Sequence, residues 1–218
     1  MGARVHNLNF HGVGDPPREL APGEATVWLS EARFRAVLDA IAGRDDVRLS
    51  FDDSFRSDVE VALPALAERG LSATFFVLAG RLGHPEHLGE HDVAALVDAG
   101  MTIGSHGLHH RNWRELDDPG LTAELCESRR VLEAAAGRAV TCAAVPFGAY
   151  DRHVLTRLRR DSGYESVFTS DGGPARDGAW LQPRISVTVR DAPGTLAVAP
   201  TPAAAAQRAI KRVVKRWR

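Results

Sequence analysis

The sequence has few residues that could cross-link the chain. Only two cysteines occur in 218 residues, Cys126 and Cys142. They are too few and too far apart for a disulfide framework, and they lack the short spacing of a zinc knuckle. We expect both to be reduced and buried, as free cysteines usually are. A chain of this length can bury a full core without such cross-links.

The sequence also lacks a strong charge imbalance and a long apolar run. Its formal net charge is −1, whereas a nucleic-acid-binding domain is usually strongly basic, so we expect no nucleic-acid partner. No segment is apolar over the length of a membrane span, and no apolar stretch typical of a signal peptide follows Met1. We therefore expect a cytoplasmic protein.

Lysine is nearly absent, and its position is informative. The only two lysines, Lys211 and Lys215, fall in the last eight residues. We expect residues 1–191 to form one domain and residues 192–218 to form a Pro/Ala-rich linker with a basic amphipathic tail. The apolar residues after position 206 share one helical face, and basic residues cover much of the rest. That layout is typical of a helix on the anionic inner surface of a membrane, and also of a helix packed on its own domain.

Short β-rich runs alternate with amphipathic helical stretches, which indicates an α/β protein with parallel strands. Either a barrel or an open doubly wound sheet fits this alternation, and in both folds functional groups gather where strands end. The expected strands are residues 5–10, 47–51, 73–78, 101–105, 139–145, 164–169 and 180–189, and the expected helices are residues 30–43, 57–69, 90–100, 121–136 and a segment from 151 onward.

Two groups of polar residues follow expected strands directly. Asp52 and Asp53 come after one strand, and His106 and His110 come after another. Two converging imidazoles and one carboxylate are the protein ligands of a hydrolytic metal site with an open position for water. Adjacent side chains at a strand end point in different directions, so the second carboxylate can face the bound water. A helix-capping aspartate pair and histidines without a ligand are the alternatives for each group alone, but the combination favours a metal site.

Three motifs resemble those of the polysaccharide deacetylase family, carbohydrate esterase family 4. Residues 50–54, SFDDS, resemble the family's TFDDG motif. Residues 105–110, SHGLHH, resemble its SH-S/T-x-x-H motif, and residues 144–151, AVPFGAYD, resemble its R-x-P-Y/F-G motif. The strand after the first motif is similar as well, and the whole resemblance covers residues 5–190.

The resemblance implies a distorted, incomplete (β/α) barrel of the polysaccharide deacetylase type. It implies Asp53, His106 and His110 as ligands of a divalent metal, usually Zn²⁺, and Asp52 as the general base. A pairing of His106 with His109 is the alternative ligand set.

The family's proton donor is normally a histidine in a C-terminal Leu-x-His motif, and no histidine follows Val189 here. Residues 8–15, LNFHGVGD, resemble instead the start of the circularly permuted branch that includes poly-N-acetylglucosamine deacetylases. In that branch the corresponding strand and its histidine come first in the chain. The resemblance therefore implies His11 as the general acid. A loop histidine that contacts only backbone is the alternative interpretation.

One position departs from the family pattern. The third motif normally begins with an arginine that orients the catalytic aspartate, but this chain has Ala144 there. Arg184, near the end of a late strand, is a candidate replacement, and a surface salt bridge is the alternative role for it. Without a replacement, Asp52 should be a poorer base.

The implied reaction is hydrolysis of the N-acetyl group of an acetamido sugar, which is polymeric or linked to a lipid or nucleotide. Pro146, Phe147 and Tyr150 are expected to contact this saccharide, and the Phe147 N–H to stabilise the oxyanion. One competing interpretation is a non-catalytic carbohydrate-binding relative, suggested by Ala144 and the missing C-terminal histidine. Another is a two-His-one-carboxylate iron oxygenase, but a second adjacent aspartate favours hydrolysis.

Overall fold

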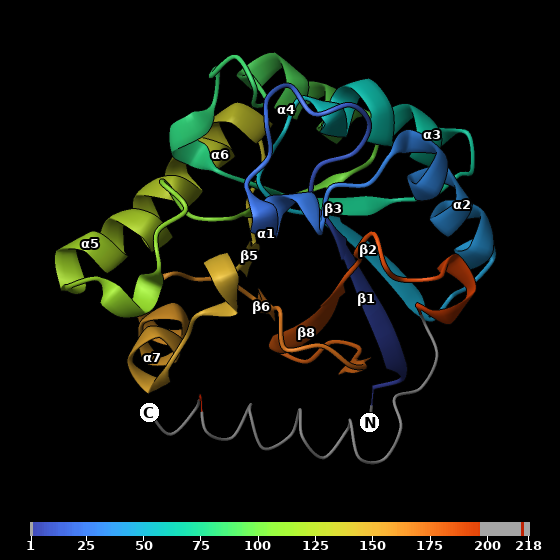
Figure 1. Ribbon diagram of the computed structural model, residues 1–218. Helices are drawn as coiled ribbons and strands as arrows, with labels where there is room; N and C mark the ends of the chain where they lie inside the picture. The colour runs from blue at the N-terminus through green and yellow to red at the C-terminus, as the bar shows by residue number, and fades with distance from the viewer. Residues whose placement is uncertain (1, 197–214, 216–218) are drawn as a thin grey trace.

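The computed structural model describes residues 2–196 and Lys215, and its centre is a closed barrel (Figure 1). Seven parallel strands form the barrel, and β1 pairs with both β2 and β8, which leaves no free edge. In order around the barrel they are β1 (Arg4–Phe10), β2 (Val47–Phe51), β3 (Ala73–Val77), β4 (Thr102–Ser105), β5 (Cys142–Ala144), β6 (Ser166–Thr169) and β8 (Leu181–Ser186). The closure excludes the open sheet and confirms the predicted (β/α) barrel, with seven strands where a complete barrel has eight.

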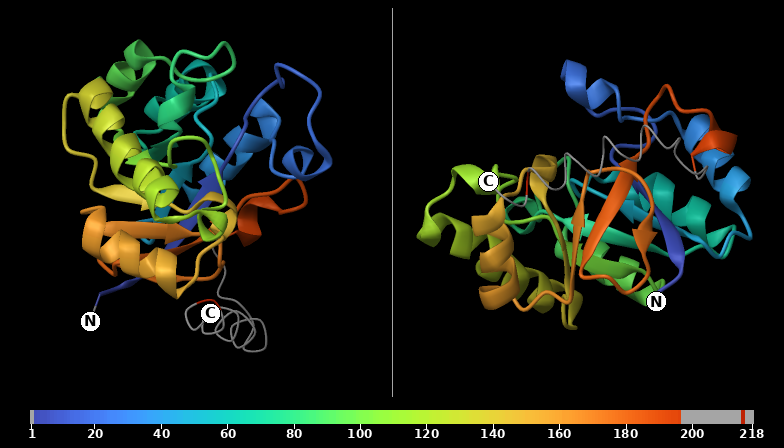
Figure 2. Two further views of the ribbon diagram at one scale, coloured as in Figure 1. Left: turned by 90° about the vertical axis from the view of Figure 1, so that its left-hand side faces the viewer. Right: turned by 90° about the horizontal axis from the view of Figure 1, so that it is seen from below.

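Helices cover the outside of the barrel, as Figures 1 and 2 show from three sides. The first long one begins where the sequence predicts, because the Ser30 side chain caps it by accepting from the Arg33 N–H. The helices are α1 (Pro22–Ala25), α2 (Glu31–Ile41), α3 (Leu63–Ala67), α4 (Glu90–Asp98), α5 (Asp118–Thr122), α6 (Ser128–Ala136) and α7 (Arg152–Asp161). Two π-helical turns, η1 (Asp58–Ala62) and η4 (Ala123–Glu127), lead into α3 and α6.

Some elements differ from the prediction in detail. The helix expected over 57–69 starts as a π-turn before α3, where Pro64 has no N–H to donate to an α-helical ladder. The helix expected to start at 121 begins at Asp118, because the Asp117 side chain caps it through the Gly120 N–H. The four-residue α1 and the two-residue β7 (Ala175–Arg176), which pairs antiparallel with β1, were not predicted because they are too short to show a periodic pattern.

Aromatic side chains align the ends of three neighbouring strands. Phe10 lies opposite Phe51 on β2, and Phe51 lies opposite Phe75 on β3. The ring centroids are 5.2 and 4.7 Å apart, and both pairs are stacked; such a pair adds about 0.5–1.5 kcal/mol beyond its area burial. The next residues along β1 and β2, His11 and Asp52, therefore leave the barrel at the same rim.

The inside of the barrel is polar on one side and apolar on the other. Phe10 contacts Phe34 of α2, so by alternation Asn9 faces the interior. There it joins Ser50 and Arg184 in a buried hydrogen-bonded group. The opposite wall is an apolar cluster of Phe76, Cys142, Ala144 and Phe168. A charged side chain inside such a barrel requires a charged partner, and the functional site provides it.

The remaining predictions concern the cysteines, membrane spans and the tail. Both cysteines are free; Cys142 is buried and Cys126 half-buried. None of the helices within 2–196 is long and apolar enough to cross a membrane. The turn Pro193–Thr195 packs against α2 and Leu196 is buried in the core, while the tail helix predicted after residue 206 lies outside the described residues except for Lys215. The domain boundary at 191 stays a prediction.

Candidate metal and catalytic site

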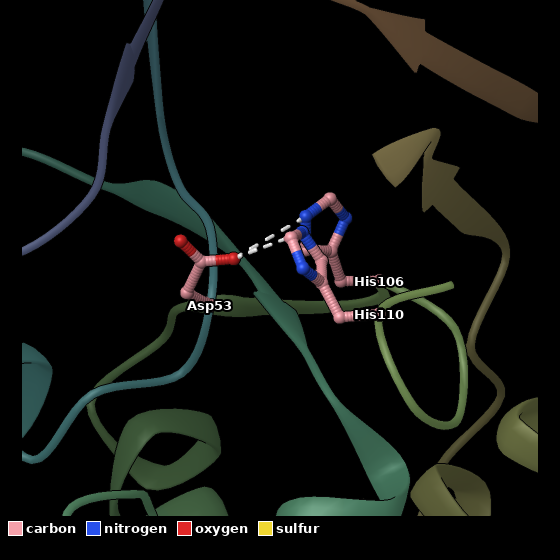
Figure 3. A group of neighbouring side chains, drawn as sticks. All are labelled: Asp53, His106 and His110. Carbon is pink, nitrogen blue, oxygen red and sulfur yellow. Dashed lines mark ion pairs between the residues drawn. The ribbon is translucent and has the colours of Figure 1, made fainter. Parts of the chain in front are cut away.

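Side chains from the ends of two strands converge at one rim of the barrel. Asp53 follows β2, and His106 and His110 follow β4. The Asp53 Oδ1 atom lies 3.5 Å from His106 Nε2 and 3.4 Å from His110 Nε2 (Figure 3). One ligand atom from each residue lies within 4.8 Å of the other two. His109, the alternative partner of His106, is exposed and does not belong to this group.

The spacing of these three atoms suits a tetrahedral metal ion. Zinc–nitrogen and zinc–oxygen bonds are about 2.0–2.1 Å long, so two ligand atoms of a tetrahedral site lie about 3.4 Å apart. Asp53 Oδ1 is buried and has no hydrogen-bond partner among residues 2–196 and Lys215. His106 Nδ1 lies 2.9 Å from the Ala144 carbonyl, which can only accept, so its N–H points there and Nε2 keeps its lone pair for a metal. The donor set therefore fits a divalent cation.

His110 is suited to the same task by its protonation state. Burial, and secondarily the nearby His106, lower the pKa of His110 to about 4. The imidazole is therefore neutral at physiological pH, which is the form that binds metals.

The backbone around these ligands adopts left-handed conformations that non-glycine residues seldom take. Asp53, Ser54 and His110 have φ angles of 72°, 54° and 55°, and each such residue costs about 1–2 kcal/mol. Two consecutive residues hold the first two in place: Nδ1 of buried His87 lies 3.0 Å from the Asp53 carbonyl, and the Leu88 N–H donates to the Ser54 carbonyl at 2.9 Å. Such strain is typical of ligand sites whose surroundings fix one geometry.

A buried carboxylate, Glu124, holds the loop between the two histidine ligands. It accepts hydrogen bonds from the Leu108 and His109 backbone N–H groups at 2.9 and 3.0 Å, and from the Trp113 indole at 3.3 Å. The loop starts at Gly107, whose φ is 86°; a Cβ there would lie 2.3 Å from Glu124 Oε2. Glycine at this position is therefore needed for both conformation and space.

The neighbouring Asp52 is buried and fully engaged by the barrel interior. Its two oxygens accept from Arg184 Nη1 and Nη2, each at 2.7 Å, and Oδ2 also accepts from Asn9 Nδ2 at 2.9 Å. Asp52 Oδ2 lies 3.8 Å from His106 Nε2. Burial alone would raise the pKa of Asp52, but Arg184, through its charge and its hydrogen bonds, holds it well below its usual range. Asp52 is therefore ionised beside the three-residue cluster.

Arg184 lies against the apolar cluster of the barrel interior while it binds Asp52. Its side chain is fully buried, and Cζ lies 4.9 Å above the Phe76 ring in the cluster that also contains Ala144. Asn9 Oδ1 accepts from Nη1 at 2.7 Å. With Ala144 on β5, the guanidinium beside Asp52 comes instead from Arg184 on β8. The surface salt bridge considered for Arg184 is not formed.

His11 lies at the same rim, after β1. It is half-buried, and its charge contributes to lowering the pKa of Asp52. Its Nδ1 is buried without a hydrogen-bond partner in the part of the chain that the structure describes.

The third motif forms a tight turn beside the histidines. In this turn, Pro146–Gly148, Phe147 has a φ of 58° and is 67% exposed, with its ring centroid 4.4 Å from that of His110. Pro146 and Tyr150 are buried, and the Tyr150 hydroxyl donates to Asp171 at 2.6 Å. Of the three predicted sugar contacts, only Phe147 offers an accessible aromatic face.

Four residues near the site were not predicted from the sequence: Asn9, His87, Glu124 and Asp58. Asn9 had a signal, because polar and apolar residues alternate in the second half of β1, from Asn7 to Phe10. Asp58 is buried with neither carboxyl oxygen paired within the described residues. Burial, Asp53 and Asp52 raise its pKa well above the usual range. The neutral form of Asp58 is therefore favoured more than in an exposed aspartate.

Comparison with known proteins agrees with the fold and the motifs. The polysaccharide deacetylase family model matches residues 40–167. Because this is more than half of the chain, the protein belongs to the polysaccharide deacetylase family. The three motifs lie inside the matched range, whereas His11 and Arg184 lie outside it.

The YxkH protein of Bacillus subtilis, whose name assigns it to the same family, is 25% identical over 167 residues. The match covers 76% of this chain and 60% of YxkH, so the chain spans less than two thirds of that relative. The deacetylase PplD of Streptococcus pyogenes, solved with acetate, has a TM-score of 0.79 at 20% identity. IcaB from Ammonifex degensii has a TM-score of 0.73 at 21% identity. Both structural matches cover 90% of this chain and 97% of the other, and at such identities they show a shared fold.

Replacing Arg184 with leucine should strongly destabilise the protein. The change leaves Asp52 buried without its charged partner, which typically costs about 3–5 kcal/mol. Urea denaturation at neutral pH measures the loss in unfolding free energy. Arg35→Leu, which removes only surface ion pairs, is the control and should have a much smaller effect. Equal losses in the two variants would contradict a structural role for the buried pair.

Replacing Glu124 with glutamine should weaken metal binding. The amide keeps the size of the side chain but one of its two acceptor oxygens becomes a donor, so the loop carrying His110 is held less well. Loss of such supporting contacts typically lowers metal affinity about 10–100-fold. Competition with a chromophoric zinc chelator measures this, and Glu127→Gln, an exposed neighbour, is the control. Unchanged zinc affinity in the Glu124 variant would count against the interpretation.

The metal-free protein should lose stability as the pH falls from 6.5 towards 4. The pKa of His110 is lower in the folded state than its unfolded value of about 6.5. Its contribution is therefore present above that pH and is lost as the unfolded chain takes up a proton, with a slope of at most about 1.4 kcal/mol per pH unit. Urea titrations in chelator should show a shallower pH dependence for His110→Asn than for the wild type. Identical slopes would show that His110 titrates normally in the fold.

Proposed function

We propose that the protein is a metal-dependent N-deacetylase that hydrolyses the acetamido group of an N-acetylated sugar and releases acetate. The observation that carries the proposal is the position of Asp52. This ionised carboxylate lies 3.8 Å from His106 and next to Asp53, whose Oδ1 faces two imidazole nitrogens. One carboxylate can thus bind an ion while its neighbour faces a water molecule on that ion.

In this proposal Asp53, His106 and His110 hold a divalent metal, with Zn²⁺ the best match to their donor atoms. When bound, Zn²⁺ lowers the pKa of a coordinated water to about 7 and polarises a carbonyl. Supporting contacts fix two of the three ligands: the Ala144 carbonyl orients His106, and Glu124 holds the loop that carries His110.

Asp52 is proposed as the general base. Arg184 and Asn9 together bind both of its oxygens and so fix the plane of the carboxylate. The arginine keeps Asp52 ionised at neutral pH, the form that can accept a proton from water. Its lowered pKa makes it a weak base by itself, so it depends on a water already acidified at the adjacent site.

The two remaining proposed groups act on the substrate's amide bond, one on its carbonyl oxygen and one on its departing amine. Its carbonyl develops negative charge on attack, and the Phe147 N–H, in the turn beside His110, is the proposed hydrogen-bond donor to it. The departing amine needs a proton, and we assign that transfer to His11, because imidazole is the side chain that exchanges protons near neutral pH.

The accessible Phe147 ring suits a saccharide as substrate. An aromatic face beside the metal ligands can pack against the apolar face of a pyranose ring while the acetamido group reaches the site. The substrate is proposed as a polysaccharide or a lipid- or nucleotide-linked sugar. The non-catalytic alternative rested on Ala144 and the missing C-terminal histidine, and the contacts of Arg184 and the position of His11 favour catalysis. The cytoplasmic location and the membrane contact of the tail stay predictions from the sequence.

Replacing Asp52 with asparagine should slow acetate release by at least about 10²-fold, the scale of lost acid–base catalysis, while zinc stays bound. Replacing His106 with alanine should instead release the metal. Acetate release from a panel of acetamido sugars and zinc content by mass spectrometry measure both effects. His153→Ala, an exposed histidine away from the cluster, is the control. Full activity of the Asp52 variant would show that another group is the base.

A further inference from the structure

Lys215, close to the end of the chain, is bound to the turn that carries Phe147. Its Nζ donates to Asp171 Oδ1 at 2.8 Å and to the Gly148 carbonyl at 2.9 Å. The ammonium also lies 5.1 Å from the centroid of the Tyr150 ring. These contacts join Lys215 to Gly148, 67 residues earlier in the chain, and to Asp171, 44 residues earlier.

The carboxylate at this contact is one that needs a cation. The Asp171 side chain is 3% exposed and accepts from the Tyr150 hydroxyl at 2.6 Å and the Thr169 hydroxyl at 2.9 Å. Both are neutral donors, and a buried carboxylate is costly without a charged partner. Lys215, itself 35% exposed, is the cation that pairs with it. The cost of burying the Asp171 carboxylate without a cation therefore explains why the Lys215 ammonium is bound beside it.

The other acceptor belongs to a strained turn. Gly148 and Phe147 are consecutive left-handed residues, with φ angles of 59° and 58°. A Cβ on Gly148 would lie 3.1 Å from the Ser170 side chain, so the turn is packed closely against the segment that carries Asp171. By donating to both the Gly148 carbonyl and Asp171, one ammonium fixes this turn against that segment.

We propose that Lys215 is a positioning residue for the deacetylase reaction, which holds the Phe147 turn in its working geometry. The inference rests on the proposed function, because it assigns the turn's N–H and ring to the substrate. Lys215 touches neither substrate nor metal in this arrangement. It acts through the Gly148 carbonyl, one residue from the proposed oxyanion donor.

The first test needs no activity. The wild-type protein is treated with limiting acetic anhydride, and acylation of each lysine is followed by mass spectrometry. Lys215 should react several-fold more slowly than in the urea-unfolded chain, because its amine must leave two acceptors before it reacts. In Asp171→Asn this protection should fall, while the reactivity of Lys211 stays unchanged. Equal reactivity of Lys215 in the wild type and the Asp171 variant would overturn the proposal.

The second test measures catalysis. Lys215→Met keeps the length of the side chain but removes its donors, and we expect kcat for acetate release to fall about tenfold, since small displacements of a reacting geometry are costly. KM should change much less. Lys215→Arg should restore part of kcat, because a guanidinium can reach both acceptors. Lys211→Met, the matched change at the other lysine, should leave both constants unchanged.

The two tests separate the possible failures. A wild-type protein without deacetylase activity but with protected Lys215 would refute the proposed function and leave the docking intact. An active protein whose kcat is the same in the Lys215 and Lys211 methionine variants would refute the positioning role alone. Circular dichroism of each variant establishes that it is folded. If Lys215→Met is not folded, Asp171→Asn is measured in its place, because it removes the charge that binds the ammonium. Its kcat should fall while KM changes much less, and an unchanged kcat would overturn the positioning role.

Discussion

The interior of this barrel is organised around one buried ion pair. Arg184 is completely enclosed and binds both oxygens of Asp52, and its Nη1 also donates to Asn9 and Ser50. Two charges at this depth are tolerated only because each satisfies the other. The pair fixes where the strand end of β2 lies relative to β8 and β1. The rim from which Asp53 and the histidines extend is defined by that contact.

Because Asp52 is fixed in this way, the two neighbouring aspartates have different surroundings. Asp52 is held from inside the barrel by Arg184 and Asn9, with its Oδ2 3.8 Å from His106 Nε2. Asp53, one residue further along a left-handed backbone, points to His106 and His110 instead. Because successive side chains at a strand end point in different directions, one barrel-bound and one ion-facing carboxylate result. The division of roles that we propose for catalysis follows from this packing.

The support around the site comes from positions that are far apart in the sequence. Glu124, in the turn before α6, holds the loop after β4, and His87, before α4, holds the backbone of Asp53. Lys215 does the same for the turn after β5. Each holds a backbone segment with an unusual conformation by binding its carbonyl or N–H groups. The contacts of Glu124 and His87 are made by buried side chains, where little solvent competes for the same groups, so they rigidify the site.

Much of the fold and of the candidate site could be predicted from the sequence, because those features depend on short stretches of residues. The alternation of strands and helices predicted an α/β fold with parallel strands, and the polar residues directly after the strands predicted one shared site, since parallel strands end at one rim. The resemblance of three short motifs to a known family implied the barrel and the ligand set Asp53, His106 and His110. The closure of the sheet was decided by the tertiary structure, which also places His110 and not the alternative His109 beside Asp53 and His106. The tertiary structure also decided the contact of Arg184 with Asp52, which lie 132 residues apart. The sequence showed only that the motif's usual arginine is absent at Ala144 and that Arg184 is a candidate to replace it. Glu124, His87 and Lys215 carried no local signal, because a contact between distant segments depends on packing that no short stretch of sequence contains.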